Sequence, residues 1–311
     1  MKTKQNKLAR MTKSGVEIKS IINEPKWENA DVVMLSAAYD KTASSHKGTV
    51  LGPKAVIKNL ASQIEFYNRE YKVEVIDYVK TAHADLGNLN KFKPELVYKK
   101  INTLAEKLVK NNKFIFTLGG EHSVPLGVYK ALANKYNPLD VTILQIDAHL
   151  DLRNDDSDYS TKPTHLAHST IMRRAHELGY NIVNVGARSF STEEINYVNQ
   201  NKNITIFESG YPKKLPNIET ILNSIKTKYL YITIDVDGFD PSVMPGTGTP
   251  VPGGLTWDYG MELLDKAISK FELIGADIVE VSPQKETVIT EYASAELAYT
   301  IITKKFQNKL K

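Results

Sequence analysis

Short runs of apolar residues recur along the chain, and several of them end directly in polar or glycine-containing segments. Phe114–Leu118, Val141–Ile146 and Leu230–Ile234 are five or six residues long and rich in β-branched side chains. Continuous runs of this length predict strands that are buried on both faces. Further runs of similar character are Asp31–Leu35, Val73–Asp77, Asn181–Val185, Ile204–Phe207 and Gly275–Glu280.

Helical spacing of apolar residues appears between some of these runs, most clearly over Pro94–Lys110. Strands that alternate with helices predict a three-layer α/β/α fold, in which a mostly parallel sheet carries helices on both faces. In such sheets, ligands bind beyond the carboxyl ends of the strands. No repeat or linker interrupts the pattern, so we predict one domain over residues 16–311, preceded by a polar, basic arm over residues 1–15.

Metal-binding residue types follow three of the predicted strands. The segment Asp147–Asp151 (Asp-Ala-His-Leu-Asp) follows one strand, and Asp235–Asp237 (Asp-Val-Asp) follows another. Alternate side chains of an extended strand point to the same side. If the backbone stays extended past the strand, five such groups therefore face one crevice. These groups are Asp147, His149, Asp151, Asp235 and Asp237, and His122, after the paired glycines Gly119 and Gly120, is the candidate sixth ligand.

The number and chemistry of these residues favour two metal ions rather than one. Four aspartates and two histidines exceed the four ligands of a closed zinc site, and they suit two cations that share carboxylates. Four carboxylates also balance the charge of two divalent ions. Because the chain contains no cysteine, the site offers oxygen and imidazole ligands only. That ligand set favours Mn²⁺ over a structural Zn²⁺.

Other interpretations of the aspartate motifs explain less. In a calcium-binding loop starting at Asp235, positions five and twelve would be Phe239 and Gly246, and neither can supply the required ligand. An aspartyl nucleophile for phosphoryl transfer would leave the Asp147–Asp151 motif without a role. A single aspartate at a strand end usually caps a loop. Six ligand-type residues at three strand ends indicate a metal centre.

The three motifs together resemble those of ureohydrolases of the arginase and agmatinase family, from about Tyr39 to the C-terminal helix. Pro245–Pro250 and Pro252–Thr256 are more similar to agmatinases, because arginases usually carry alanine where Gly246 stands. The resemblance implies an arginase-like fold and a dinuclear manganese enzyme that cleaves a guanidino group to urea and an amine. The reaction expected first is agmatine to putrescine and urea, a step of polyamine synthesis.

The resemblance also implies roles for individual residues. His122 and Asp151 would bind one ion, His149 and Asp237 the other, and Asp147 and Asp235 would bridge them. Two further acids complete the expected site. Glu280, at the end of a predicted strand, matches the acid that binds the guanidinium, and Asp240 is expected to orient a ligating histidine or the aspartate loop.

The departing amine needs a proton, and a loop histidine is the usual donor because its pKa is near neutrality. His168 resembles the histidine that precedes a helix in related agmatinases. His165, three residues earlier, is the competing candidate. We expect one of the two histidines to deliver the proton.

The identity of the substrate depends on the loop after Asp151. Arg153–Asp158 is net acidic, so Asp155 and Asp158 are predicted to attract a cationic tail such as that of agmatine. Lys285 stands where agmatinases commonly have an aromatic residue, which leaves aminopropylagmatine, guanidinobutyrate and arginine as alternatives. A metal-binding paralogue without activity is a second class, and release of urea separates the two classes.

Composition places further limits on function. The chain of 311 residues has 40 basic and 36 acidic residues, a net charge of +4, which does not indicate nucleic-acid binding. It shows no apolar core of a signal peptide near residue 1 and no apolar run of about 18 residues, so we expect a soluble cytoplasmic protein without a membrane partner. The family resemblance implies a homo-oligomer, either a trimer or a hexamer.

Overall fold

The computed structural model describes residues 20–44 and 47–311, and its centre is an eight-stranded parallel sheet. The strands lie in the order β4-β1-β5-β10-β9-β6-β7-β8. Their bounds are Val32–Ala38 (β1), Thr81–Asn88 (β4), Phe114–Gly119 (β5), Val141–Ile146 (β6), Asn181–Ala187 (β7), Ile204–Glu208 (β8), Tyr229–Asp235 (β9) and Glu272–Val279 (β10). The predicted α/β/α architecture is confirmed.

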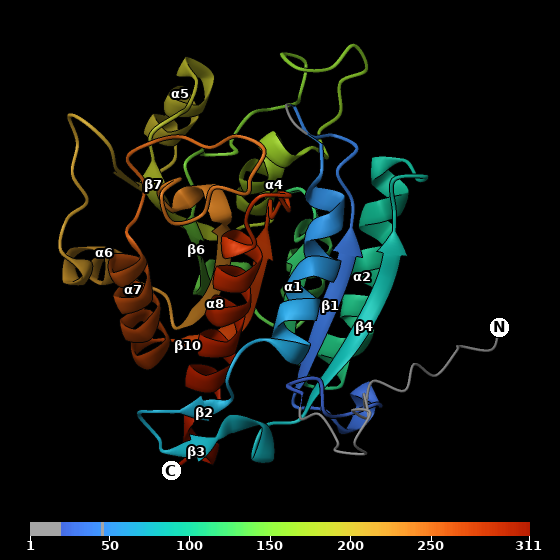
Figure 1. Cartoon of the computed structure of the whole chain (residues 1–311). Coiled ribbons are helices and arrows are strands. Elements are labelled where there is room, and N and C mark those ends of the chain that lie inside the picture. The colour runs from blue at the N-terminus through green and yellow to red at the C-terminus, as the bar shows by residue number, and fades with distance from the viewer. Residues whose placement is uncertain (1–19, 45–46) are drawn as a thin grey trace.

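Helices cover both faces of the sheet (Figure 1). One face is covered by α1 (Gly52–Ser62), α6 (Ile218–Ser224), α7 (Trp257–Lys270) and α8 (Ile289–Lys305). The other is covered by α2 (Pro94–Lys110), α3 (Leu126–Ala133), α4 (Ile171–Glu177) and α5 (Thr192–Gln200). The helix predicted over Pro94–Lys110 has the observed bounds of α2.

The strands contribute to a separate hydrophobic core on each side of the sheet. Within β1, Val32 and Met34 pack in the core under α1 and α8, whereas Val33 and Leu35 pack in the core under α2 and α3. All four side chains are fully buried. The two-residue period of a strand therefore explains why its sequence is continuously apolar: each face meets a different helical layer.

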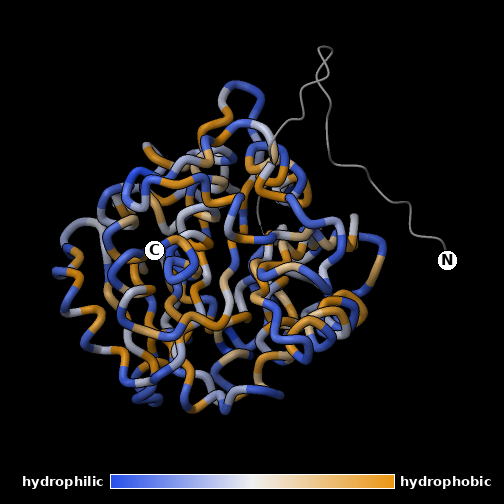
Figure 2. Tube along the Cα trace, turned by 90° about the horizontal axis from the view of Figure 1, so that it is seen from below, coloured by the Kyte–Doolittle hydropathy of each residue, from blue (hydrophilic) through white to orange (hydrophobic). Residues whose placement is uncertain are grey.

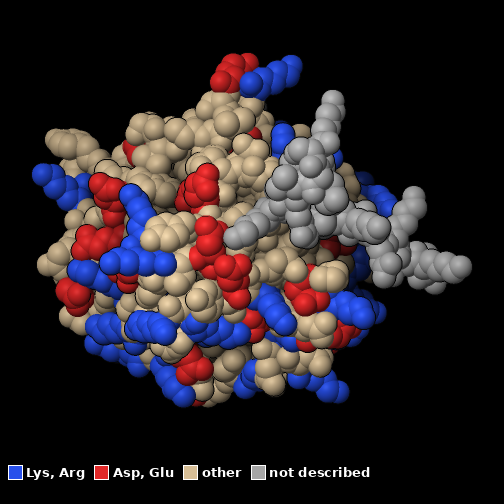
Figure 3. Space-filling view, turned by 60° about the horizontal axis from the view of Figure 1, so that its bottom comes forward, with Lys and Arg blue, Asp and Glu red and all other residues tan. Residues whose placement is uncertain are grey.

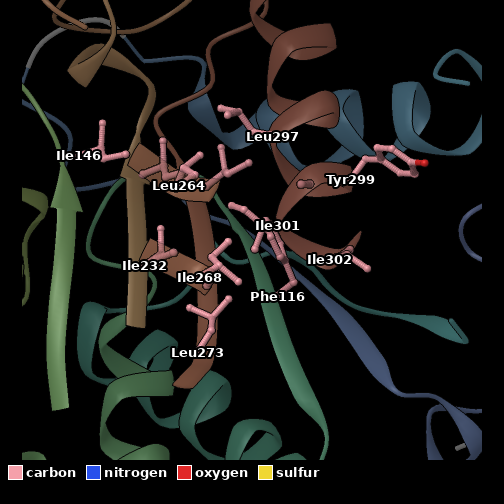
Figure 4. Close-up of a cluster of buried hydrophobic side chains, with 14 of the residues drawn as sticks. Phe116, Ile146, Ile232, Leu264, Ile268, Leu273, Leu297, Tyr299, Ile301 and Ile302 are labelled. Atoms are coloured by element: carbon pink, nitrogen blue, oxygen red, sulfur yellow. The ribbon is translucent and has the colours of Figure 1, made fainter. Parts of the chain in front are cut away.

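The hydrophobic cores dominate the interior, and hydrophilic stretches lie mainly at the periphery (Figure 2). Figure 4 shows the core between the sheet and the helices α7 and α8, where Ile232 of β9 lies near Leu264 and Ile268 of α7 and near Ile301 of α8. Close packing of this kind holds the central strands in a fixed register. A rigid sheet is what a metal site at its edge requires.

One strand prediction was wrong. Val73–Asp77 lies outside the main sheet: Val73–Glu74 (β3) pairs antiparallel with β2 (Tyr67–Asn68), and Val75–Asp77 forms a 3-10 turn (Figure 1). Val75 is buried in the core beside α1 and α8, so the apolar run caps that core rather than joining the sheet. The edge strand is instead β4, whose mixed sequence, with His83, Asp85 and Gly87, gave no apolar run.

The strand order brings the chemically important segments together. The strands β5, β10, β9 and β6 are adjacent at the centre of the sheet, although β5 and β6 are separated from β9 and β10 by more than 80 residues. All four are parallel, so their carboxyl ends meet at one edge. Each of the predicted metal motifs, and Glu280, follows one of these four strands.

The surface carries interspersed acidic and basic side chains on the face seen in Figure 3, as is usual for a solvated surface. Among the described residues, none of the helices combines the length and the apolar character needed to cross a bilayer. The arm predicted over residues 1–15 lies outside the described residues, and the single domain over residues 16–311 stays a prediction.

Candidate metal centre and active site

The ligand-type residues converge, but not through continued strand geometry. Beyond β9 the chain turns into a short 3-10 turn, Val236–Gly238, and Asp151 has a left-handed backbone with φ of 54°. The condition that the backbone stays extended past the strand ends is therefore not met. Carboxylates that accept hydrogen bonds from nearby backbone N–H groups make the turns instead: Asp235 Oδ1 accepts from the N–H of Asp237 at 3.0 Å, and Asp147 Oδ1 accepts from that of His149 at 2.6 Å.

His122 faces three of the carboxylates. Its Nδ1 lies 3.1 Å from Asp147 Oδ2, 3.0 Å from Asp151 Oδ2 and 3.6 Å from Asp235 Oδ2. The residue is completely buried at the end of β5. It follows Gly120, where an added Cβ would lie 2.0 Å from the carbonyl oxygen of Tyr39, so that only glycine allows the chain to approach so closely.

Hydrogen bonds on the far side of the ring determine the tautomer of His122. The hydroxyl of Thr233 donates to Asp277 Oδ1 at 2.6 Å, so it must accept from His122 Nε2, which lies 2.9 Å away. In the neutral ring, Nε2 then carries the proton and Nδ1 presents a lone pair. That buried Nδ1 has no hydrogen-bond partner. A lone pair aimed at carboxylate oxygens fits a cation held between them.

A second group lies beside the first and shares one carboxylate with it. His149 Nδ1 lies 3.2 Å from Asp237 Oδ2 and 3.6 Å from Asp147 Oδ1. Two clusters therefore have ligand atoms within 4.8 Å of one another: His122, Asp147 and Asp235 form the first, and Asp147, His149 and Asp237 form the second. Asp147 belongs to both. The ligand set of carboxylate oxygens and imidazole nitrogens fits two divalent cations.

The electrostatics of the cluster also fit bound cations. Burial, with the charges of nearby acids, raises the pKa of Asp235 well above its ordinary value and that of Asp151 to about 7. Burial by itself would lower the pKa of His122, yet the adjacent carboxylates of Asp147 and Asp151 raise that pKa well above the usual range. Acids crowded in this way cannot all ionise without nearby positive charge. Divalent ions would supply that charge.

Glu280 lies next to this centre, directly after the strand β10. Its Oε1 accepts a hydrogen bond of 2.9 Å from the N–H of His122, and its own N–H donates to the carbonyl of Gly120 at 2.7 Å. Its φ of 62° is left-handed, a conformation that costs a non-glycine residue about 1–3 kcal/mol and is often found at functional sites. Burial, together with the charge of Glu121, raises the pKa of Glu280 well above its ordinary value.

Comparison with known proteins identifies the family. The sequence model of the Arginase family matches residues 30–303. The chain belongs to the arginase family. It is 32% identical to the N(1)-aminopropylagmatine ureohydrolase of Synechocystis sp. over 89% of each chain, and 33% identical to the agmatinase of Bacillus subtilis over 85% of this chain and 87% of that one. The resemblance to ureohydrolases that the motifs indicated is therefore confirmed, and the chain is a hydrolase of this family.

A solved structure supports the same assignment. The agmatine ureohydrolase of Thermoplasma volcanium superimposes with a TM-score of 0.79 at 28% identity, over 93% of this chain and 94% of that one. The shared fold extends over nearly the whole arginase-family chain.

His168, one of the two proton-donor candidates, lines the pocket above the metal centre of this arginase-family chain. Its Nδ1 lies 2.8 Å from the carbonyl of Thr42, which can only accept, so Nδ1 carries a proton and Nε2 is free to accept. The Ser44 hydroxyl lies 3.1 Å from that Nε2. Burial lowers the pKa of His168 to about 4, which keeps the ring neutral near pH 7.

His165, the other candidate, lies away from the pocket. Its Nδ1 is 2.7 Å from the carbonyl of Asn154, within the same surface loop, and the residue is not among those that line the cavity. The cavity wall contains four residues to which the sequence assigned no role: Ala43, Ser44, Gly248 and Thr249. Their types carry no distinctive chemical signal, so only the folded chain reveals them.

The acids predicted to attract the substrate tail lie outside the cavity lining. Asp158 forms an ion pair with Arg153, and Asp155 is partly exposed and accepts a hydrogen bond of 3.0 Å from the N–H of Ser157. The net charge of the loop is therefore partly compensated within the loop itself.

Asp240 lies one turn beyond the second metal motif. Its carboxylate accepts hydrogen bonds from the backbone and hydroxyl of Ser242 and from the N–H groups of Gly253 and Gly254. These bonds lower its pKa to about 2. The residue ties the aspartate loop to the glycine-containing loop, and no hydrogen bond joins it to a histidine among the described residues.

Proposed function

We propose that this arginase-family chain is a manganese-dependent ureohydrolase that cleaves agmatine to putrescine and urea. The observation that carries the proposal is the lone pair of buried His122 facing three carboxylates, directly beside Glu280. The family relationship supports the chemistry, and relatives named agmatinase support the substrate. The motif Pro245–Pro250, with glycine at position 246, points the same way.

Six residues would hold two Mn²⁺ ions, with Asp147 and Asp235 proposed as the bridging carboxylates. When bound, such ions lower the pKa of water and stabilise negative charge as it develops on the reacting group. The protein contributes a rigid, largely buried set of ligands, since the six side chains follow three adjacent or nearly adjacent strands. The proposed ligands are His122, Asp147, His149, Asp151, Asp235 and Asp237.

Glu280 would orient the substrate. One of its oxygens is already held by the N–H of His122, so the other is free to accept from the parallel N–H donors of a guanidinium. A cationic substrate would also favour the ionised carboxylate that burial disfavours. Binding of this kind places the guanidinium carbon over the metal centre, and orientation of the reacting atoms lowers the entropic cost of reaction.

His168 would move the proton. In its neutral form, Nε2 carries a lone pair beside the Ser44 hydroxyl and can take the proton that the attacking water releases, while Nδ1 stays bonded to Thr42. The proton on Nε2 can then pass to the nitrogen of the departing amine, which leaves as a neutral amine as urea forms. His165 remains the alternative proton carrier.

The tail of the substrate is the least constrained part of the proposal. Asp155 and Asp158 would favour a cationic amine over the zwitterionic end of arginine. Aminopropylagmatine is the second candidate, because a relative of the chain is named for its hydrolysis and that substrate would add a further positive charge. Guanidinobutyrate, with a carboxylate tail, is expected to be poor. An inactive metal-binding paralogue is the alternative to any enzyme.

A urea-release panel with Mn²⁺ supplied tests the proposal. We expect kcat/KM for agmatine to exceed that for arginine at least about tenfold, a difference of roughly 1.4 kcal/mol in transition-state binding. A matched Glu280→Gln variant should lose activity on every guanidine while keeping both ions. Equal hydrolysis of arginine would refute the agmatine assignment, and metal binding without urea release would favour the inactive paralogue.

A cytoplasmic homo-oligomer, either a trimer or a hexamer, is proposed from the family resemblance. Sedimentation velocity of the purified chain at several concentrations measures the assembly. A monomer at all concentrations would contradict this part of the proposal without affecting the chemistry.

A further inference from the structure

Arg188 lies immediately after β7, and its guanidinium group binds backbone carbonyls from three separate segments of the chain. The group is half-buried, and among the described residues it forms no ion pair with a carboxylate. Its N–H groups donate to the carbonyl oxygens of Gly186 (2.8 Å), Asp237 (2.6 Å), Gly238 (3.4 Å), Phe239 (3.3 Å) and Val251 (2.7 and 3.1 Å). Among the described residues, the charged guanidinium thus donates hydrogen bonds to backbone carbonyl oxygens only.

Three of the acceptors belong to the end of the 3-10 turn that carries Asp237. Carbonyls at the end of a helical turn lack partners within the turn and need donors from elsewhere. A cation at that end also interacts favourably with the aligned peptide dipoles. Arg188 therefore stabilises the particular backbone conformation that presents Asp237 to the metal centre.

The backbone of Arg188 is bonded to the other metal-binding segment. Its N–H donates to the carbonyl of Ala148 at 2.8 Å, and the N–H of Ala148 donates in turn to Asp237 Oδ1 at 3.1 Å. Ala148 lies between the ligands Asp147 and His149. One residue consequently links the segment that carries His149 with the segment that carries Asp237.

A third link runs to the wall of the pocket. Val251, which accepts two of the guanidinium hydrogen bonds, follows Thr249 by two residues, and the hydroxyl of Thr249 donates to Asp237 Oδ2 at 3.1 Å. Gly254 makes room for the arrangement, because an added Cβ there would lie 2.7 Å from Nη2 of Arg188. A planar group with five N–H donors can span these acceptors, whereas a lysine ammonium cannot.

We propose that Arg188 is a positioning residue that holds Asp237 opposite His149. It thereby sets the metal affinity of the ligand cluster formed by Asp147, His149 and Asp237. It touches neither the ligand atoms nor the pocket. The ligand cluster around His122 depends on other contacts, through Thr233 and the ends of β5 and β9. Its metal affinity is therefore expected to change little when Arg188 is replaced. The inference rests on the dinuclear function proposed above.

The test compares the full-length chain with Arg188→Lys and Arg188→Gln variants, after ions have been removed and Mn²⁺ is titrated back by calorimetry. The matched control is Arg174→Lys, which replaces another half-buried arginine whose guanidinium binds Glu177 of its own helix. We expect wild type and control to bind two ions. In both Arg188 variants the Mn²⁺ affinity of the site formed by Asp147, His149 and Asp237 should fall about 10–100-fold, the range for residues that orient metal ligands. The Mn²⁺ affinity of the site around His122 should stay within about threefold.

Electron paramagnetic resonance of Mn²⁺ gives a second measurement that a general structural role would not change. With one equivalent of Mn²⁺, the variants should show a signal of isolated ions, and the spin-coupled signal of a pair should need excess metal. The melting temperature of the ion-free protein should stay near that of the wild type.

Several outcomes would overturn the inference. Unchanged affinities would exclude a positioning role, and equal weakening of both sites with a lower ion-free melting temperature would assign Arg188 to the fold as a whole. Loss of folding in both variants would lead to the same conclusion. If the wild-type chain itself bound fewer than two ions, the dinuclear proposal would fail before the role of Arg188 came into question.

Discussion

The floor of the pocket and the loop Arg153–Asp158, which follows Asp151 in the sequence and is called the rim below, differ in how their charged groups are held. On the floor, acids such as Asp147 and Asp237 are almost completely buried and accept hydrogen bonds from backbone N–H groups of the segment that follows β6. On the rim, Asp155 is partly exposed, and Asp158 pairs with Arg153 within one loop. Charges on the floor have no solvent to compensate them, whereas those on the rim do.

This difference separates chemistry from selectivity. A buried carboxylate that loses its cation or partner leaves an uncompensated charge at low dielectric, which costs several kcal/mol. An exposed charge is worth about 1 kcal/mol or less. Changes on the floor should therefore abolish the reaction, and changes on the rim should alter only the preference among substrates.

The largest effect is expected from Asp147→Ala, because this carboxylate belongs to both ligand groups. Turnover should fall to background and metal content well below two ions per chain, measured by urea release and by elemental analysis. Asp235→Ala should behave similarly if Asp235 also bridges. Two tightly held ions with near-normal turnover in either variant would show that the bridging assignment is wrong.

Replacement of His168 by alanine should lower kcat by about 10² to 10⁴-fold, the range for loss of a general acid–base group. Metal content should stay normal, because the side chain bonds to Thr42 and Ser44 rather than to the ligands. The matched variant is His165→Ala, in the same loop but bonded to Asn154. The reverse pattern, with loss in His165→Ala only, would transfer the role to His165.

A rim substitution should be far milder. Asp158→Asn leaves Arg153 without its ion-pair partner, so the local potential becomes less attractive to an amine, and kcat/KM for agmatine should fall about two- to fivefold. Steady-state kinetics at low and moderate salt measures the change, which added salt should reduce. A loss as large as that in His168→Ala would mean that Asp158 takes part in the reaction itself, and would contradict the distinction between floor and rim.

The smallest effect concerns the buried carboxylate of Asp277 and the way it makes the free energy of unfolding depend on pH. Burial raises the pKa of Asp277 from 3.8 to about 6, so the folded state holds this proton more tightly than the unfolded state. The contribution to stability is present at low pH and is lost as pH rises from about 4 to 6. In ion-free protein, Asp277→Asn should make the slope of unfolding free energy against pH less negative by up to about 1.4 kcal/mol per pH unit.

The control for that measurement is Asp155→Asn, which changes a partly exposed acid of the rim. Denaturant unfolding at pH 4, 5 and 6 should give the wild-type slope for this variant. An unaltered slope in Asp277→Asn would mean that the buried carboxylate does not hold a proton over this range.

Local pattern was sufficient for most of the fold. Continuous apolar runs located seven of the eight strands, because a strand covered on both faces must be apolar at every position. Prediction from apolar runs failed for β4, an edge strand of mixed sequence, and for Val73–Asp77, where an apolar run covers the end of a core. Neither exception could be recognised locally, since burial at an edge or beneath a helix pair depends on distant parts of the chain.

The sequence by itself determined the type of chemistry, because carboxylates and histidines at strand ends, without cysteine, restrict the metal ions and the reactions. Only the tertiary structure decided which atoms meet. The order β5-β10-β9-β6 places Glu280 beside His122, and the turns after β6 and β9 replace the extended geometry that local periodicity suggests. Arg188 joins those turns through carbonyl groups that every residue possesses. Backbone acceptors carry no sequence signature, so this linkage exists only in the folded chain.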